Sequence, residues 1–294
     1  MAGTATPGFD EAFDALIRLE AASWLAGDPA LLRAAAERCG SLLELEPSSP
    51  SCTLPHVPPV SDRAREIALS FTSQFCLDVA ALDELTRVEM TEALGAGAFD
   101  FVQAVFVFDY APRVRAVLAA VTDASGDATD RAATEDAPGS LWDALEAFLR
   151  AVGRLRQLDP VTSELVRLRG ARQHDCRLCQ SLRSRSALVA GADEQLFALV
   201  DHPGSDRLSP RHRAALELTD ALIWHPARLS PDLLAEARRQ LSEEERTELV
   251  LDVMRNAANK VAVALGADAP HVATGVEIYD IDDHGDAVYG LPLP

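Results

Sequence analysis

Aromatic side chains are scarce in this chain of 294 residues, and basic residues are fewer than acidic ones. Phe, Trp and Tyr make up only 5% of it, whereas Ala, Leu, Arg and Glu, which lose little freedom in a helix, are abundant. With 27 basic against 46 acidic residues, the formal net charge is −19. Such a surface repels phosphate backbones and anionic lipids, so neither nucleic acid nor a membrane is an expected partner.

Long apolar runs are also missing. No stretch approaches the ~18 uninterrupted apolar residues of a membrane span. The N-terminal sequence MAGTATP lacks the basic and apolar regions of a signal peptide. Hydrophobic residues nevertheless form 48% of the chain, which is enough for a sizeable core and too much for a disordered protein. We therefore expect a cytoplasmic protein with one large domain or two modest domains.

The spacing of apolar residues predicts an all-α fold. Over Phe9–Trp24, for example, Phe13, Leu16 and Ile17 share one stripe of an amphipathic helix. Further helices are expected to begin at Asp28, Ser61, Leu82 and Gly97. In the second half, helices are expected over residues 140–155, 160–172, 176–190, 209–224, 231–240 and 242–265. Residues 278–283 are ambiguous and are compatible with an extended tail.

A weak internal repeat divides the chain into two related halves. When the first half is aligned with the second at one fixed difference in residue number, Ser61 aligns with Ser209 and Arg63 with Arg211. Several apolar positions align as well. Helical sequences also share apolar periods by chance, so a chance match stays open as the alternative to a duplication. We predict helical hairpins in two halves: a degenerate half over residues 1–120, a linker over residues 121–139 and a second half over residues 140–294.

Cysteine is rare and unevenly placed. The chain contains Cys39, Cys52, Cys76, Cys176 and Cys179. An odd, scattered set does not fit the disulfide framework of a secreted domain. The C-x-x-C pair of Cys176 and Cys179 instead indicates redox, catalytic or metal-binding chemistry in a reducing compartment. If Asp175 caps a helix that begins at Cys176, the helix dipole favours a thiolate there, and Cys179 lies within reach of a disulfide.

The local charge around this pair is opposite to that of the whole chain. From Ser163 to Arg185 there are six arginines but only two acids, Glu164 and Asp175. Most of these arginines are expected to be solvated, salt-bridged surface residues. Arg183 differs, because a continuous helix would place it one turn beyond Cys179 on the same face, where a guanidinium would favour a thiolate.

Other uses of a C-x-x-C pair fit less well. Zinc needs four ligands, but only His174 is nearby, so Cys39 or Cys76 would have to complete the site. Haem attachment requires His where Gln180 stands, and a thioredoxin-like domain requires a βαβ pattern that is missing. We predict neither a metal nor a cofactor site. Two inert, buried cysteines are the simplest alternative.

The residues on either side of the pair carry a family resemblance. Upstream of Cys176 stand Glu164, Leu168, Arg169 and Ala171, and the C-x-x-C opens a helix. With the later run Arg255–Lys260, this pattern resembles the alkylhydroperoxidase D and carboxymuconolactone decarboxylase superfamily over about residues 158–267. The resemblance implies an all-α fold of helical hairpins, assembled as a homo-oligomer, commonly a trimer.

The resemblance also implies roles for individual residues. In family members with the full motif, the second cysteine attacks a peroxide and the first resolves the product as a disulfide. Carried over, Cys179 is peroxidatic, Cys176 is resolving and faces the partner, and Glu164 belongs to a proton relay.

The sequence departs from the family pattern at two positions. Leu178 and Arg183 stand where the family usually has histidines, so its proton shuttle has no counterpart there. His174 and His225 are the imidazoles that could replace it, although the sequence does not place either of them near the cysteines.

Three functions remain in competition. The preferred function is a thiol-dependent oxidoreductase or peroxidase, whose Cys176–Cys179 dithiol cycles through a disulfide without a bound cofactor. By family analogy it acts on a small hydroperoxide or disulfide and is reduced by a lipoyl domain or a thioredoxin-like protein. The first alternative is a cysteine-independent enzyme for a small carboxylate or lactone, with Glu164 in acid–base catalysis and Arg183 in anion binding. The second alternative is a non-catalytic oligomeric scaffold.

Overall fold

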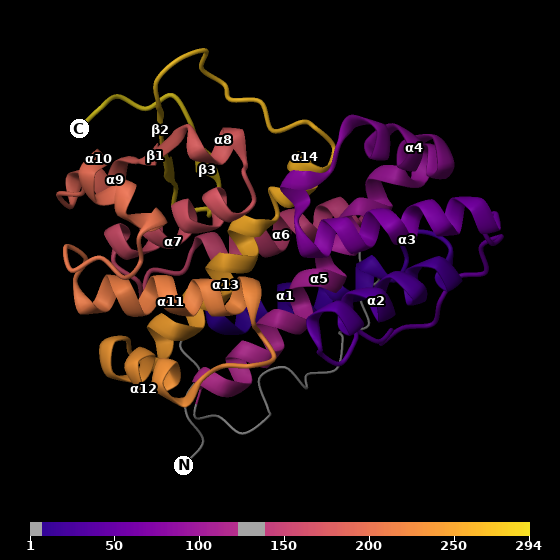
Figure 1. The fold of residues 1–294 in the computed structure, drawn as a ribbon, viewed down its shortest axis with the longest axis horizontal. Helices are drawn as coiled ribbons and strands as arrows, with labels where there is room; N and C mark the ends of the chain where they lie inside the picture. Colours follow the sequence, from indigo (N-terminus) through magenta and orange to yellow (C-terminus); the bar gives the residue numbers. More distant parts are fainter. Residues whose placement is uncertain (1–7, 123–138) are drawn as a thin grey trace.

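A computed structural model describes residues 8–122 and 139–294 and is predominantly helical (Figure 1). The first part contains α1 (Phe9–Ser23), α2 (Pro29–Leu43), α3 (Asp62–Leu77), η1 (Val79–Ala81), α4 (Glu84–Leu94), η2 (Gly95–Gly97) and α5 (Ala98–Val121). The second part contains α6 (Leu141–Gly153), α7 (Pro160–Gln173), α8 (Arg177–Gln180), α9 (Arg185–Val189), α10 (Glu194–Phe197), η3 (Ala198–Asp201), α11 (Pro210–Trp224), α12 (Pro231–Gln240), α13 (Glu243–Ala257) and α14 (Lys260–Ala264). The all-α prediction is confirmed. Most of the predicted linker lies outside the described residues.

Many helices begin at a side chain that caps the first turn. Asp28 and Asp159 accept backbone N–H bonds at the starts of α2 and α7, and each is followed by Pro at the first helical position. Ser140 and Ser242 form complete capping boxes at the starts of α6 and α13. Because these signals are local, most helix starts within the described ranges could be predicted from the sequence. No helix within those ranges is long and apolar enough to cross a membrane.

Helix α5 lies at the centre of the molecule. Its side chains are apolar on nearly all sides and are buried along most of its length, as expected of a helix enclosed by others. It packs against α1 and α2 from the first half and against α13 from the second half, while α1 also packs against α6. One hydrophobic core therefore runs through both halves. A smaller core, which includes Leu165, Leu168 and Phe197, lies within the second half.

The proposed duplication stays a prediction. Ser61 and Ser209, which the sequence repeat aligns, both cap helices, and those helices begin the pairs α3–α4 and α11–α12. Capped helical pairs are common in all-α proteins, so this agreement alone does not establish a tandem repeat.

The continuous helix predicted over residues 176–190 is wrong. The chain forms the short helix α8, then the strand β1 (Leu182–Ser184), then α9. β1 pairs in parallel with β2 (Glu277–Ile281), which pairs antiparallel with β3 (Ala287–Val288). The segment whose structure the sequence left ambiguous thus contains a strand, β2. Backbone pairing with β2 overrides the helical sequence pattern of β1. The helix predicted over residues 242–265 is also divided, into α13 and α14.

We predict that deletion of residues 1–125 leaves a second half that aggregates. The deletion exposes the surfaces of α6 and α13 that now pack against α1 and α5. Size-exclusion chromatography and circular dichroism of the fragment test this expectation. A monodisperse fragment with native helical content would show that the second half folds independently.

Candidate active site around a disulfide

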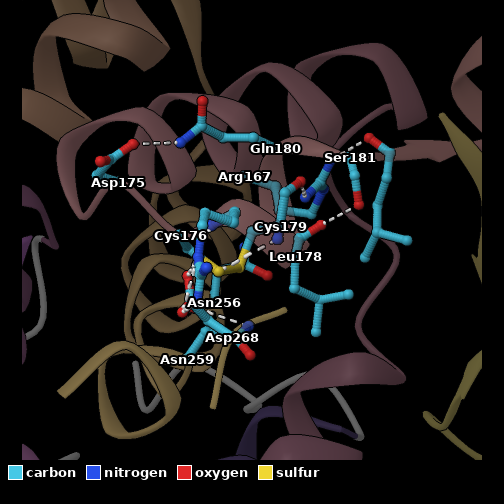
Figure 2. Close-up of a disulfide and its surroundings, with 12 residues drawn as sticks. Arg167, Asp175, Cys176, Leu178, Cys179, Gln180, Ser181, Asn256, Asn259 and Asp268 are labelled. Atoms are coloured by element: carbon cyan, nitrogen blue, oxygen red, sulfur yellow. Dashed lines mark hydrogen bonds and ion pairs between the residues drawn. A yellow bond between two sulfur atoms is a disulfide. The ribbon is translucent and has the colours of Figure 1, made fainter. Parts of the chain in front are cut away.

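The C-x-x-C pair forms a disulfide in the structure (Figure 2). Helix α7 ends at Gln173, and Asp175 turns the chain with a positive φ of 47°. Cys176 itself occupies the N-cap of α8, and its Sγ atom accepts a hydrogen bond from the Cys179 backbone N–H at 3.1 Å. The prediction that Asp175 is the N-cap was therefore wrong by one residue. Because a backbone N–H points at it, the Cys176 sulfur can carry negative charge more easily when the disulfide opens.

Asp268, just beyond α14, holds the start of this turn. Its carboxylate accepts the Arg177 backbone N–H at 2.8 Å and pairs with the Arg177 guanidinium at 2.6 Å. Its carbonyl accepts the Leu178 N–H at 2.9 Å. Although partial burial raises the pKa of Asp268, hydrogen bonds from Arg177 give a net lowering. The carboxylate thus stays ionised and fixes the first turn of α8.

Both cysteines line a cavity of about 420 Å³. Cys176 is 1% exposed and Cys179 is 6% exposed. A small molecule can therefore reach the two sulfurs more readily than the surface of a second protein can. Most of the other lining side chains are apolar, and they include Leu145, Leu149, Leu178, Val261 and Leu265. Asn256 and Asn259, from the run Arg255–Lys260, also line it.

Glu164 is buried in α7 and belongs to a closed hydrogen-bond network. It accepts two bonds from Arg167, at 2.7 and 2.8 Å, one from the Ser184 N–H at 3.1 Å, and one from the Tyr279 hydroxyl at 3.1 Å. Arg167 in turn donates to the carbonyls of Cys179 and Leu182, at 2.7 and 2.9 Å. Glu164 therefore orients the C-terminal side of the disulfide turn through Arg167.

Arg167 and Tyr279 belong to this network, and sequence reasoning assigned neither of them to the candidate site. Burial lowers the pKa of Arg167, but the adjacent Glu164 charge outweighs it and raises the pKa, so the guanidinium remains charged. Burial raises the pKa of Tyr279, which keeps its hydroxyl protonated as the donor to Glu164. The i, i+3 spacing of Glu164 and Arg167 indicates in the sequence that these two side chains can form an ion pair. No local signal identifies Tyr279, since it arrives on β2 from a distant part of the chain.

The placement predicted for Arg183 was wrong. Because β1 interrupts the helix, Arg183 pairs with Glu194 at 2.7 Å and lies over the Phe197 ring, 5.6 Å from its centroid. It also donates to the carbonyls of Gln180 and Leu182, at 2.8 and 2.7 Å. Arg183 does not line the cavity that contains the sulfurs. It supports the backbone that follows α8.

Of the two histidines considered as proton shuttles, only His174 lines the cavity. Its Nε2 atom lies 2.9 Å from the Tyr110 hydroxyl. Burial, followed by the positive charge of Lys260, places the pKa of His174 well below its usual value, so the imidazole is neutral near pH 7. His225 is exposed at the C-terminus of α11. In residues 8–122 and 139–294, no group of three or more His, Cys, Asp or Glu side chains could hold a metal ion.

A second cavity of about 130 Å³ shares Arg167, Arg255 and Tyr279 with the first. Two acids of α13, Glu248 and Asp252, line it. Burial and then the charge of Asp252 raise the pKa of Glu248 to about 8, and burial raises the pKa of Asp252 to about 6. Near neutral pH the pair therefore holds about one proton, mainly on Glu248, beside the wall of the disulfide cavity. Their i, i+4 spacing in an apolar helix was an overlooked signal.

We predict that Glu248→Gln stabilises the protein more at pH 9 than at pH 5. The fold favours neutral Glu248, so its contribution to stability is fully present below the unfolded pKa of about 4.5 and is lost as the pH rises through about 8. Gln resembles the neutral form, and we expect a gain on the order of 1–3 kcal/mol at pH 9. Denaturant unfolding measures it, with exposed Glu244→Gln as the control. A pH-independent difference would contradict the assigned protonation.

The comparisons with known proteins include a family match over the segment that contains the disulfide turn. The carboxymuconolactone decarboxylase family matches residues 140–221, which include the disulfide turn. Uncharacterized proteins from two strains of Mycobacterium tuberculosis, CDC 1551 and H37Rv, are each 43% identical over 286 residues, covering 94% of this chain and 97% of the relative. An uncharacterized protein of Bacillus subtilis strain 168 is 30% identical over 112 residues, covering 37% of this chain and 76% of the relative.

No solved structure matches the chain. The family match nevertheless lies on the half that carries Glu164, Arg167 and the disulfide, and the mycobacterial relatives extend over both halves. The resemblance inferred from the sequence is thereby confirmed. The chain belongs to the carboxymuconolactone decarboxylase family, within the alkylhydroperoxidase D-like superfamily.

Proposed function

We propose that the protein is a thiol–disulfide oxidoreductase that reacts through Cys176 and Cys179. The observation that carries this proposal is the position of the two bonded sulfurs in the wall of a largely apolar cavity of about 420 Å³. The turn that holds them is fixed on one side by Asp268 and on the other by Arg167. A turn anchored on both sides keeps two thiols close enough to re-form the disulfide after each reduction.

The proposed cycle has two balanced half-reactions. In the oxidative half, two thiols and a hydroperoxide ROOH give the disulfide, an alcohol ROH and water. In the reductive half, one thiol of an external dithiol attacks one sulfur, and the other protein sulfur leaves as a thiolate. The second external thiol then attacks this mixed disulfide, so the reductant leaves as a disulfide and its two protons restore both protein thiols. The Cys179 N–H that donates to Sγ of Cys176 favours Cys176 as the leaving thiolate. Residue Cys179 is 6% exposed against 1% for Cys176, which favours attack at Cys179 and departs from the partner-facing role that the family resemblance implies for Cys176.

The surrounding residues position the disulfide turn and line the cavity in this proposal. Glu164 and Arg167 orient the turn, and Tyr279 links Glu164 to the cavity. His174 lies in the cavity wall, but burial and the charge of Lys260 disfavour its protonated form, so in this proposal it shares a hydrogen bond with the Tyr110 hydroxyl and is not the acceptor of the thiol proton. Arg183 is assigned a positioning role, since its guanidinium is fully engaged with Glu194 and main-chain carbonyls.

The burial of the disulfide favours a reductant that can enter the cavity. A dithiol on a flexible arm, such as that of a lipoyl domain, suits this geometry better than the flat surface of a thioredoxin-like protein. Small hydroperoxides and small disulfides are the proposed oxidising substrates. A homo-oligomer is part of the proposal through family analogy.

The two alternatives find less support. A cysteine-independent decarboxylase or lactone-processing enzyme would need Glu164 and Arg183 to face a substrate, whereas each is paired with an oppositely charged neighbour. A purely structural scaffold leaves unexplained why the disulfide borders a cavity of this size.

Substitution of either cysteine tests the proposed function. We expect Cys176→Ser and Cys179→Ser each to lower dithiol-dependent hydroperoxide reduction at least about 100-fold, because no disulfide can form. Cys52→Ser, at a half-buried cysteine outside the site, is the control. Activity is followed with dihydrolipoamide as the reductant, and mass spectrometry follows the disulfide. Two free thiols that persist at Cys176 and Cys179 in excess diamide would exclude the redox cycle.

Arg183→Ala separates positioning from thiolate stabilisation. Because Arg183 faces Glu194 rather than the sulfurs, we expect a loss of about 1–3 kcal/mol in stability. The alkylation rate of the reduced dithiol at neutral pH should change less than about twofold. In contrast, Arg167→Ala leaves Glu164 buried without its ion-pair partner and should cost about 3–5 kcal/mol. Alkylation that slows tenfold in folded Arg183→Ala would restore the original thiolate-binding assignment.

A further inference from the structure

A second pair of sulfurs lies in the first half, outside the site described above. Cys39 belongs to α2 and Cys76 to the last turn of α3, and their Sγ atoms are 3.0 Å apart. Both side chains are buried, and neither is part of a disulfide. A disulfide bond requires a separation of ~2.05 Å, so an approach of about 1 Å would join them.

The packing around this pair keeps the sulfurs together. Helices α2 and α3 pack directly against each other, and α2 also packs against the central helix α5. The Cys76 carbonyl accepts a bond from Arg113 of α5 at 3.4 Å. Arg113 is itself fixed by Asp109, at 2.7 Å. The two thiols therefore face each other because of their helices, not because of a mobile loop.

Cys76 also borders a cavity of about 20 Å³, which has room for roughly one water-sized molecule. The walls of this cavity include the largely exposed side chains of Leu77 and Trp224. His174 contributes to this cavity and to the larger one with the C-x-x-C disulfide. A small oxidant such as hydrogen peroxide can thus approach Cys76, whereas a protein partner cannot.

We propose that Cys39 and Cys76 are a second oxidation site, which hydrogen peroxide converts into a disulfide that links α2 to α3. The Cys76 sulfur attacks one peroxide oxygen, the O–O bond breaks, and Cys76 becomes a sulfenic acid with release of one water. The Cys39 sulfur then attacks the sulfenic sulfur and displaces the second water. One peroxide is reduced to two waters as two thiols are oxidised to one disulfide.

The surroundings also set the rate of this step. Burial, followed by the hydrogen bond with Cys39, raises the pKa of Cys76 well above its usual value, while Lys260 acts in the opposite direction. Little thiolate is present at neutral pH, so this pair reacts more slowly than an exposed thiol. The disulfide accumulates under sustained oxidant rather than during a single turnover.

The full-length double variant Cys176→Ser/Cys179→Ser isolates this site from the proposed catalytic dithiol. After complete reduction, it is incubated with excess hydrogen peroxide, and peptides are mapped by mass spectrometry without reduction. We expect a linked Cys39–Cys76 peptide pair, a loss of about 2 Da, and a rise of at least about 4 °C in melting temperature. Addition of Cys39→Ala should abolish the link and the rise, whereas addition of Cys52→Ser should change neither.

Three results would overturn the proposal. They are free thiols at both positions after prolonged excess peroxide, sulfinic acid at Cys76 without a link to Cys39, and a link from either cysteine to Cys52. Because Cys176 and Cys179 are absent from this background, none of these results bears on the proposed oxidoreductase activity. Loss of that activity in the single cysteine variants would likewise leave this proposal intact.

Discussion

The buried ion pair between Glu164 and Arg167 organises this protein around its disulfide. It lies within α7, yet its hydrogen bonds reach the carbonyl of Cys179, the backbone of β1 and the hydroxyl of Tyr279 on β2. An uncompensated charge is costly in such a place, so each partner requires the other. Since both charges have most of their hydrogen-bonding capacity filled, the pair fixes geometry and leaves the proposed chemistry to the sulfurs.

The sequence located the helices well because their start signals are local. Ser61, Ser140 and Ser209 cap helices where expected, and the apolar stripes of the long helices match their buried faces. The pair Cys176 and Cys179 was recognisable for the same reason, since both residues and their spacing lie in one short segment.

The errors have a common physical origin in contacts between distant segments. β1 exists because β2 pairs with it, and β2 begins at Glu277, far along the chain from Leu182. That pairing turns Arg183 away from the sulfurs and brings Tyr279 to Glu164, and neither event leaves a local trace in the sequence. The approach of Cys39 to Cys76 is of the same kind, because it depends on the packing of two helices. Helical periodicity predicts which faces are buried, but not which buried residues meet.

The late position of β2 in the chain also has a consequence for biosynthesis. A ribosome releases α7 and the Cys176–Cys179 turn well before residues 277–289, which form one wall of the disulfide cavity. During that interval Glu164 lacks the Tyr279 hydroxyl, and the sulfurs lack part of their cover. The nascent cysteines are therefore more accessible to thiols and oxidants than those of the finished protein. Docking of the C-terminal strands closes that period of exposure.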